Sequence, residues 1–413
     1  MNQQPTTLSQ QLQKAFRGKR VWLSGHTGFK GSWLSEWLLQ LGAVVHGYAL
    51  APDTTPALFD QLGLAGRLEH EVADIRDGVQ VRNSIQEFRP DFVIHMAAQP
   101  LVRRSYLIPV ETYETNVMGT IHVLEALRSL ASTSTLQLQQ SPVTAIIVTT
   151  DKCYQNHESG RAYEEGDPLG GHDPYSSSKA MAEIAAAAYR NSYFQKGPVR
   201  LASARAGNVI GGGDWAEDRI VPDAMRALNL GEKIAVRNPR AVRPWQHVLE
   251  PLSGYLLLAA KIAGSGVKAE SLSSSPASGA STSTAQLQLA SLFDAFNFGP
   301  GPDSNRTVAD LVNEILKNRS GSWEDKSDPS SLHEATLLNL SIDKAEFLLG
   351  WKPKWSFGET IAKTVSWYDQ VHSGAVLPLK ITRSQIVEYQ DSPSPWFSLK
   401  GMDTKIERDE DRL

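Results

Sequence analysis

A tyrosine and a lysine four positions apart are the first candidates for chemistry in this chain. Tyr175 and Lys179 stand in the stretch YSSSK, and residues four apart share one face of a helix. A phenol with an ordinary pKa near ~10 acts as a base at neutral pH only where positive charge stabilises the phenolate. The spacing therefore predicts a tyrosine base assisted by Lys179, with an oxidised nicotinamide as a second source of positive charge.

A second polar stretch, TTDKCY at residues 149–154, comes after an apolar run that we expect to be a buried strand. It places Asp151 and Lys152 side by side just ahead of the tyrosine–lysine pair. A solvent-exposed turn pair is the alternative interpretation of these two residues. Cys153 has no histidine placed to activate it, so we interpret it as a packing residue.

The scaffold for these groups is indicated by residues 21–41, where an apolar run meets Gly25, Gly28 and Gly31 and helical periodicity begins. Residues without a Cβ let a pyrophosphate approach the backbone, and the start of a helix offers free N–H groups and a positive dipole end. We therefore expect a strand, a glycine turn and a helix that bind a dinucleotide. No Gly-Lys-Ser/Thr stands at the phosphate-loop offset, which argues against a nucleoside-triphosphate hydrolase.

Seven apolar segments alternate with helical stretches along most of the chain, a pattern typical of an α/β protein. We predict a Rossmann-type doubly wound parallel sheet with a smaller C-terminal substrate lobe. The strands are expected at 21–23, 43–50, 68–75, 91–98, 143–149, 199–206 and 293–299. We expect the NAD-binding domain to cover residues 18–206, 244–263 and 291–300, and the substrate lobe to cover 207–243 and 301–373. Low-complexity insertions are expected at 131–142 and 264–290, and a C-terminal tail, partly ordered at best, at 374–413.

The type of dinucleotide is indicated by the residues at the ends of the second and third strands. The acidic residue that usually binds the ribose does not end the second strand, and no arginine stands there for a 2′-phosphate, so NAD is favoured over NADP. Asp74 could bind the adenine amino group or cap the next helix. Small residues after the fourth strand, Ala97 and Ala98 ahead of Gln99, would let the cofactor lie flat.

Composition excludes several classes of function. The chain has 413 residues, 41% of them hydrophobic, and a formal net charge of −4, which gives no broad basic surface for nucleic acid or anionic lipid. No run of 18 apolar residues occurs, and the single cysteine excludes a disulfide framework. His95, His172 and His247 lack ligand spacing, so we expect no metal site and interpret them as core residues or as residues that hydrogen-bond to the groups of the site. We expect a soluble, cytoplasmic protein with a small-molecule partner.

Eight stretches of the chain resemble one family of enzymes. They include GHTGFKGSW, TDKCY, GGHDPYSSSK and RPWQHVLEPL, and together they span about residues 21–368 without the insertions. They resemble the extended short-chain dehydrogenase/reductases that act on nucleotide sugars, and within them the CDP-glucose 4,6-dehydratases. The resemblance implies bound NAD, CDP-glucose or a related nucleotide sugar as substrate, a role in deoxysugar synthesis, and a homodimer or higher homo-oligomer paired through the helices that begin near Asn116 and Tyr175.

The resemblance also implies a reaction. NAD+ takes hydride from sugar C4 while Tyr175, helped by Lys179 and Thr150, removes the 4-hydroxyl proton. Asp151 then acts as the acid for the departing 6-hydroxyl and Lys152 as the base for the C5 proton, before hydride returns to C6. Related dTDP-glucose dehydratases carry a glutamate in place of Lys152, and a lysine that acts as a base must be neutral.

The predicted contacts come from the motifs and the resemblance together. The cofactor contacts are Gly25, Thr27, Gly28, Phe29, Lys30, Gly31, Asp74, Ile75, Ala97, Ala98, Gln99, Asn116, Thr149, Tyr175 and Lys179. The substrate contacts are Gln99, Asn208, Arg219 and Arg243. Arginines suit a nucleoside diphosphate because they bind phosphate through two hydrogen bonds.

Two alternative functions share this scaffold. A nucleotide-sugar 4-epimerase would use the same tyrosine, lysine and cofactor, but it has no use for an acid and a base at 151 and 152. A non-catalytic dinucleotide-binding regulator could keep the fold alone. The intact catalytic set argues against the regulator.

Overall fold

A seven-stranded parallel sheet forms the centre of the computed structural model, which describes residues 7–132, 142–195, 197–265, 291–328 and 338–392. The strand order is β11-β6-β5-β4-β1-β2-β3, and every neighbouring pair is parallel. The strands are β1 Arg20–Ser24, β2 Val44–Ala49, β3 Glu69–Val72, β4 Phe92–His95, β5 Val143–Val148, β6 Val199–Ala206 and β11 Ala295–Phe298. All seven lie within a residue or a few of the predicted segments, so the prediction of a doubly wound parallel sheet is confirmed.

Helices cover both faces of this sheet because its strands are apolar on both sides. In β1, Val21 and Leu23 belong to one hydrophobic cluster, while Trp22 between them belongs to the other. One face carries α4 Gly78–Phe88, α7 Gly119–Ala131 and α9 Pro174–Tyr193, and the other carries α1 Leu8–Phe16, α2 Phe29–Gln40, α11 Leu249–Gly264 and α16 Pro378–Asp391. The chain therefore buries two cores, one on each side of the sheet.

The remaining elements connect these layers or build the lobe. The helices are α3 Leu58–Gln61, α5 Val102–Leu107, α6 Pro109–Tyr113, α10 Ile220–Leu230, α13 Val308–Asn318, α14 Asp343–Leu349 and α15 Phe357–His372. Short helical turns are η1 Leu64–Gly66, the π-type turn η2 Glu114–Met118, η3 Asp151–Cys153 and η5 Pro302–Ser304. The short strands are β7 Val209–Ile210, β8 Ile234–Val236, β9 Val242–Pro244, β10 Gln246–His247, β12 Asn305–Thr307 and β13 Trp323–Asp325.

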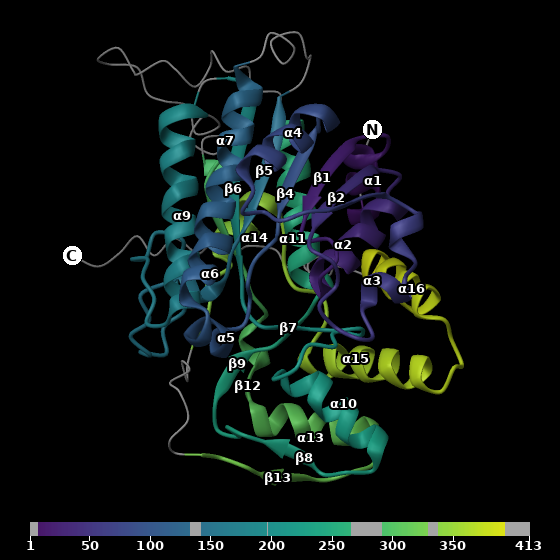
Figure 1. The fold of residues 1–413 in the computed structure, drawn as a ribbon. Coiled ribbons are helices and arrows are strands. Elements are labelled where there is room, and N and C mark those ends of the chain that lie inside the picture. Colours follow the sequence, from purple (N-terminus) through teal and green to yellow (C-terminus); the bar gives the residue numbers. More distant parts are fainter. Residues whose placement is uncertain (1–6, 133–141, 196, 266–290, 329–337, 393–413) are drawn as a thin grey trace, which may run out of the picture.

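The lobe lies below the sheet in Figure 1 and is built from α10, α13 and the small strand pairs β8–β13 and β9–β12. The chain enters the lobe directly after β6, so the lobe faces the carboxyl ends of the central strands. Within the range 301–373 that we expected in the lobe, α14 instead packs on β11 and α11. Ala345 and Leu349 of α14 are buried there, so this boundary of the lobe differs from the predicted one.

The segment predicted as a C-terminal tail contains the 14-residue helix α16, which packs against α1, α2 and α15. Ile381, Ile386 and Tyr389 are buried, and Arg383 forms an ion pair of 2.7 Å with the buried Glu36. The prediction of a tail is therefore wrong for residues 378–391. The two predicted insertions fall almost wholly outside the described residues.

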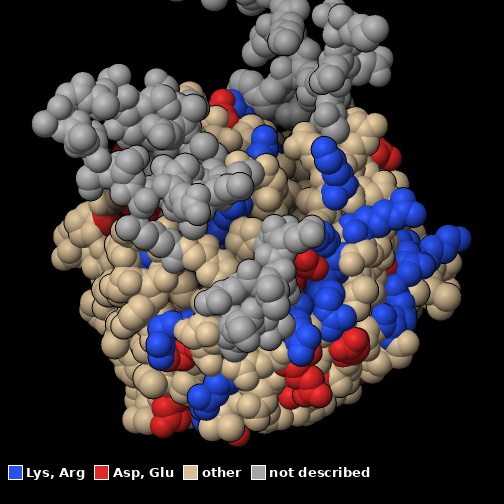
Figure 2. Space-filling view, turned by 90° about the horizontal axis from the view of Figure 1, so that it is seen from above, with Lys and Arg blue, Asp and Glu red and all other residues tan. Residues whose placement is uncertain are grey.

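The end of the molecule opposite the lobe is seen in Figure 2. Basic side chains gather toward one side of this face, and acidic side chains lie among and beside them, within a surface that is otherwise largely uncharged. None of the helices in the described ranges has the length and apolar character needed to span a bilayer.

Candidate active site

In the glycine turn after β1, the backbone at Gly25 lies in close contact with the backbone at Ala97. Gly25 has φ +75°, and a Cβ placed there would lie 2.7 Å from the backbone nitrogen of Ala97. A Cβ on Gly31 would lie 2.0 Å from the carbonyl oxygen of Gly25. Gly28 is the N-cap of α2 and makes no side-chain hydrogen bond to it, so no capping side chain takes up the first N–H groups of that helix. This backbone cradle fits a dinucleotide pyrophosphate, and the individual contacts expected there stay predictions.

Ser24, which we did not single out from the sequence, joins this turn to the end of β4. Its hydroxyl oxygen accepts hydrogen bonds from the backbone of Met96 and Ala97, at 3.0 and 3.1 Å, and lies 2.7 Å from Nδ1 of His95. Nε2 of His95 lies 3.1 Å from the Thr120 hydroxyl, and burial lowers the pKa of His95 to about 3. His95 is thus a hydrogen-bonded core residue, in agreement with the prediction.

Asn116 lies in the π-type turn η2 and connects the end of β4 to α9. Its Oδ1 accepts a hydrogen bond of 2.8 Å from the backbone of Gln99, and its Nδ2 donates to the Gln99 carbonyl and to the Ser178 hydroxyl. The side-chain amide of Gln99 is itself hydrogen-bonded within the protein. Its expected contact with cofactor or substrate stays a prediction.

Asp151 and Lys152 come after β5, in the turn η3, with Thr150 as its cap. Asp151 is only 1% exposed, so the interpretation as a solvent-exposed turn pair is wrong. One carboxylate oxygen accepts a hydrogen bond of 2.9 Å from the Thr150 hydroxyl, and the other is buried with no hydrogen-bond partner among the described residues. A Cβ on Gly207 would lie 2.9 Å from that second oxygen. The site therefore holds a buried carboxyl group with one oxygen available.

Lys152 points toward the start of the lobe. Its Nζ lies 3.8 Å from Asp151 Oδ1 and donates a hydrogen bond of 3.3 Å to Asn208 Oδ1. Two of the predicted catalytic residues and one predicted substrate contact are thus brought together.

Tyr175 and Lys179 lie in the first turns of α9, which begins at Pro174 behind the capping carboxylate of Asp173. Both side chains are buried, and the Tyr175 phenol is hydrogen-bonded to Thr150. Burial raises the pKa of Tyr175 to about 12 and lowers that of Lys179 to about 8. Burial alone therefore works against the phenolate, which makes the charge beside it important.

Lys30 reaches from the glycine-turn helix to the same place. Its Nζ donates a hydrogen bond of 3.1 Å to the Tyr255 hydroxyl on α11. Burial and, to a smaller extent, the positive charges of Lys179 and Arg219 lower the pKa of Lys30 to about 7. The glycine turn and the tyrosine–lysine pair thus face one site, as a cofactor-dependent enzyme requires.

Two arginines predicted to bind substrate come from the lobe. Arg219 precedes α10 and forms an ion pair of 2.8 Å with Asp214, whose charge raises the pKa of the arginine. The Tyr175 phenol also acts on it electrostatically, so Arg219 lies near Tyr175. Arg243 is buried in β9 and donates a hydrogen bond of 3.0 Å to the Val242 carbonyl.

Comparison with known proteins identifies the family. The family model described as GDP-mannose 4,6 dehydratase matches residues 23–364. A CDP-glucose 4,6-dehydratase of Salmonella typhimurium is 44% identical over 363 residues, which are 86% of this chain and 91% of that protein. The chain belongs to the nucleotide-sugar 4,6-dehydratase family. The resemblance indicated by the motifs is confirmed.

More distant matches share the fold of this dehydratase family. A dTDP-glucose 4,6-dehydratase of Streptomyces antibioticus is 29% identical over 84% of this chain and 91% of its own. The solved dTDP-glucose 4,6-dehydratase of Streptomyces venezuelae, with NAD bound, has a TM-score of 0.67 at 23% identity, covering 87% of this chain and 99% of that one. The solved UDP-glucose 4-epimerase of Thermotoga maritima has a TM-score of 0.66 at 20% identity, and the match covers 86% of this chain and 99% of that one. The fold is common to dehydratases and epimerases, so only side chains can separate them.

In this family member, the residues after β3 are paired among themselves. Asp74 accepts hydrogen bonds from the backbone and guanidinium of Arg76, which hold the pKa of the carboxyl below its usual value. Asp77, not Asp74, caps α4. Thr27 donates to a backbone carbonyl and Ile75 is buried. The adenine contact of Asp74 stays a prediction.

His247 and Cys153 are packed in the core of this dehydratase fold, whereas His172 is exposed, so the interpretation of His172 as a core residue is wrong. His247 lies edge-on to Trp33 and Trp355, and burial lowers its pKa to about 3. Cys153 is buried, which raises the pKa of its thiol. Within the described ranges, no group of three or more histidine, cysteine or acidic residues could hold a metal ion.

Proposed function

We propose that this protein converts CDP-glucose to CDP-4-dehydro-6-deoxyglucose and water, with NAD as a retained cofactor. The observation that carries the proposal is the buried Asp151 carboxyl beside Lys152 and next to the Tyr175 phenol. The 44% identity to a CDP-glucose 4,6-dehydratase supports the choice of nucleotide sugar. The glycine cradle and the NAD-bound dehydratase of the same fold support the cofactor.

The first half of the proposed reaction depends on Tyr175. Bound NAD would supply the acceptor for the C4 hydride and the donor that returns it to C6. Tyr175 accepts the proton of the 4-hydroxyl, and the Thr150 hydrogen bond and the positive charge of Arg219 favour the phenolate. Lys179, four residues further along α9, would add a second positive charge. The resulting ketone at C4 acidifies the proton on C5.

The second half depends on the pair at the end of β5. Asp151 donates a proton to the departing 6-hydroxyl, and its second oxygen is the atom free to do so. Lys152, oriented by Asn208, accepts the C5 proton and returns a proton to C5 when hydride adds at C6. Arg219 and Arg243 offer bidentate hydrogen bonds to the diphosphate.

Product analysis with the purified enzyme and CDP-glucose tests this proposal. A 4-keto-6-deoxy product, which absorbs in alkali, is expected. Formation of CDP-galactose would instead show a 4-epimerase, and faster turnover of dTDP-glucose or GDP-mannose than of CDP-glucose would overturn the choice of nucleotide.

We also propose a homodimer that pairs through η2 and α9 and works in the cytoplasm. Met118, Met181 and Ile184 are 44%, 46% and 55% exposed on these neighbouring elements, an apolar surface typical of an interface. Ile184→Glu should halve the mass measured by light scattering. The matched change Phe347→Glu, at a 74% exposed position on α14, should not. An unchanged mass for Ile184→Glu would contradict this interface.

A further inference from the structure

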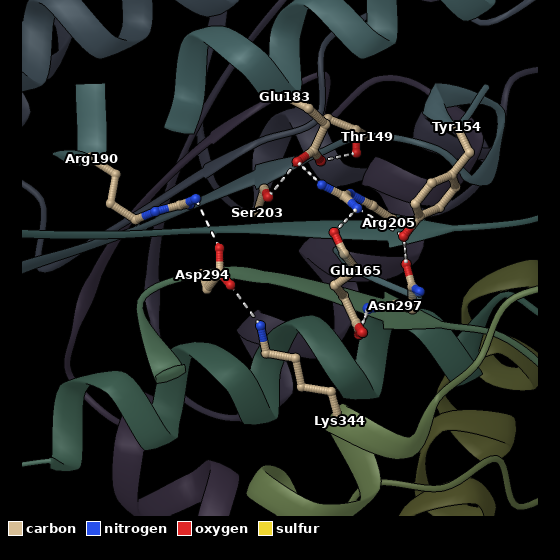
Figure 3. Close-up of polar contacts among 10 residues, drawn as sticks. All are labelled: Thr149, Tyr154, Glu165, Glu183, Arg190, Ser203, Arg205, Asp294, Asn297 and Lys344. Carbon is tan, nitrogen blue, oxygen red and sulfur yellow. Dashed lines mark hydrogen bonds and ion pairs between the residues drawn. The ribbon is translucent and has the colours of Figure 1, made fainter. Parts of the chain in front are cut away.

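Glu183 extends the line of catalytic residues on α9, because it stands four residues after Lys179 and eight after Tyr175. Its carboxylate is buried and accepts three hydrogen bonds, drawn in Figure 3. They come from the hydroxyls of Thr149 and Ser203, at 2.5 and 2.7 Å, and from Arg205, at 2.9 Å. Glu183 therefore connects the catalytic helix to the first residue of the stretch TTDKCY.

Arg205 holds the other end of the same stretch. Its Nη1 donates hydrogen bonds of 2.8 Å to the Tyr154 hydroxyl and 3.0 Å to the Glu165 carbonyl. Tyr154 in turn donates to Asn297 of β11 at 2.7 Å. The buried Glu183–Arg205 ion pair thus binds both ends of residues 149–154, the stretch that includes Thr150, Asp151 and Lys152.

The burial of this pair points to a role beyond stability. The side chains of Glu183 and Arg205 are 2% and 5% exposed. Taking two charges out of water costs about as much as their attraction returns, so a buried ion pair adds little net stability over packed apolar residues. Burial raises the pKa of Glu183, but the charge and hydrogen bonds of Arg205, with the two hydroxyls, outweigh it and keep the group ionised.

The charge of Glu183 acts on Lys179. The groups that face Lys179 are Glu183 on α9, Cys153 in η3, Lys30 on α2 and His95 in β4. The buried thiol and the buried imidazole are neutral, and Lys30 carries no negative charge in either of its protonation states, so Glu183 is the ionised acid of this set. Its negative charge opposes the burial that would otherwise discharge Lys179.

We propose that Glu183, held by Arg205, is a positioning residue that sets Thr150 and Asp151 against Tyr175 and keeps Lys179 cationic. The inference rests on the proposed function through the roles of these residues. It deepens that function, because it adds a third member to the tyrosine–lysine pair.

The test is the pH profile of sugar oxidation in Glu183→Gln, which keeps the shape and removes the charge. In the proposed mechanism Tyr175 and Lys179 titrate as one pair, and Glu183 acts on its lysine member. Loss of the negative charge then lowers both macroscopic pKa values of the pair, so both limbs should move to lower pH by about one unit. The maximal rate of reduced-cofactor formation should fall about tenfold, since the state with phenolate and ammonium is less favoured. A purely structural defect would lower the rate without moving the limbs.

Two further variants complete the experiment. Asp294→Asn breaks ion pairs of 2.9 and 2.8 Å with Arg190 of α9 and Lys344, drawn in Figure 3, yet touches nothing in 149–154, so its profile should match the wild type. Glu183→Gln with Arg205→Met leaves no unpaired buried charge. This double variant should fold even if Glu183→Gln alone does not. The limbs of its pH profile should shift in the same direction as those of Glu183→Gln, but by a smaller amount.

The outcomes separate this inference from the proposed function. Wild-type turnover of CDP-glucose with unshifted limbs in Glu183→Gln and in the double variant would overturn the inference alone. If the wild type does not act on CDP-glucose, the proposed function fails. Ultraviolet titration of the Tyr175 phenolate, taken as a difference from Tyr175→Phe, then reads the same shift without substrate, and an unshifted titration would overturn the inference.

Discussion

Lys152 Nζ donates a hydrogen bond of 3.3 Å to Asn208 Oδ1, and this contact joins the end of β5 to the first turn of the lobe. Asn208→Ala should leave the lysine unoriented and slow removal of the C5 proton about fivefold, since one hydrogen bond is worth about 1 kcal/mol. Incorporation of solvent deuterium at C5 measures that step. Asn318→Ala, a surface change in α13, should not alter it, and equal rates in all three proteins would contradict the role of Asn208.

Tyr175→Phe removes the proposed proton acceptor and little volume. Turnover should be abolished while the cofactor stays bound, because the phenol is buried next to Thr150 and the change leaves the packing of α9 intact. Product formation and the amount of NAD retained after purification check the two halves of this prediction. Activity equal to the wild type would refute the assigned role.

Asp151→Asn keeps the shape of the carboxyl group but removes the acid. Oxidation at C4 should continue while loss of water slows about 100-fold or more, the range for general acid catalysis. Reduced cofactor should therefore accumulate in a single turnover, which absorbance detects. A variant that eliminates water at the normal rate would overturn the assignment.

Gly25→Ala tests the backbone cradle. The left-handed φ of +75° costs an L-residue about 1–2 kcal/mol, and the new Cβ would also lie 2.7 Å from the Ala97 nitrogen. We expect loss of NAD retention and a lower urea midpoint. Gly63→Ala is the matched control, with φ +60° and open space around the new Cβ. It should show the backbone cost without loss of cofactor, and equal retention in the two variants would refute the close contact.

His247 makes stability depend on pH. Its folded pKa of about 3 lies below the ordinary 6.5, so the unfolded chain binds the extra proton and stability falls as the pH drops below 6.5. His247→Gln should flatten the curve between pH 6.5 and 4 by about 1.4 kcal/mol per pH unit. Urea unfolding across this range measures the slope. Parallel curves for the variant and the wild type would contradict the prediction.

Local sequence patterns predicted those parts of the structure that depend on residues close together in the sequence. The glycine turn, the spacing of Tyr175 and Lys179, and the seven buried strands result from backbone sterics and from hydrophobic periodicity within a few residues. Helix α16 was missed because its buried residues, Ile381, Ile386 and Tyr389, are separated by charged and polar ones, and only packing against α1, α2 and α15 gives them a core.

The sequence by itself determined the scaffold and which side chains we propose as the reacting groups. Only the tertiary structure decided how those groups are charged and held. Glu183 stands 22 residues from Arg205, and Lys30 stands 225 from Tyr255, yet each pair is in hydrogen-bond contact. The physical reason is that burial and electrostatic fields depend on distances in space, which strand order and helix packing set and which no local pattern contains.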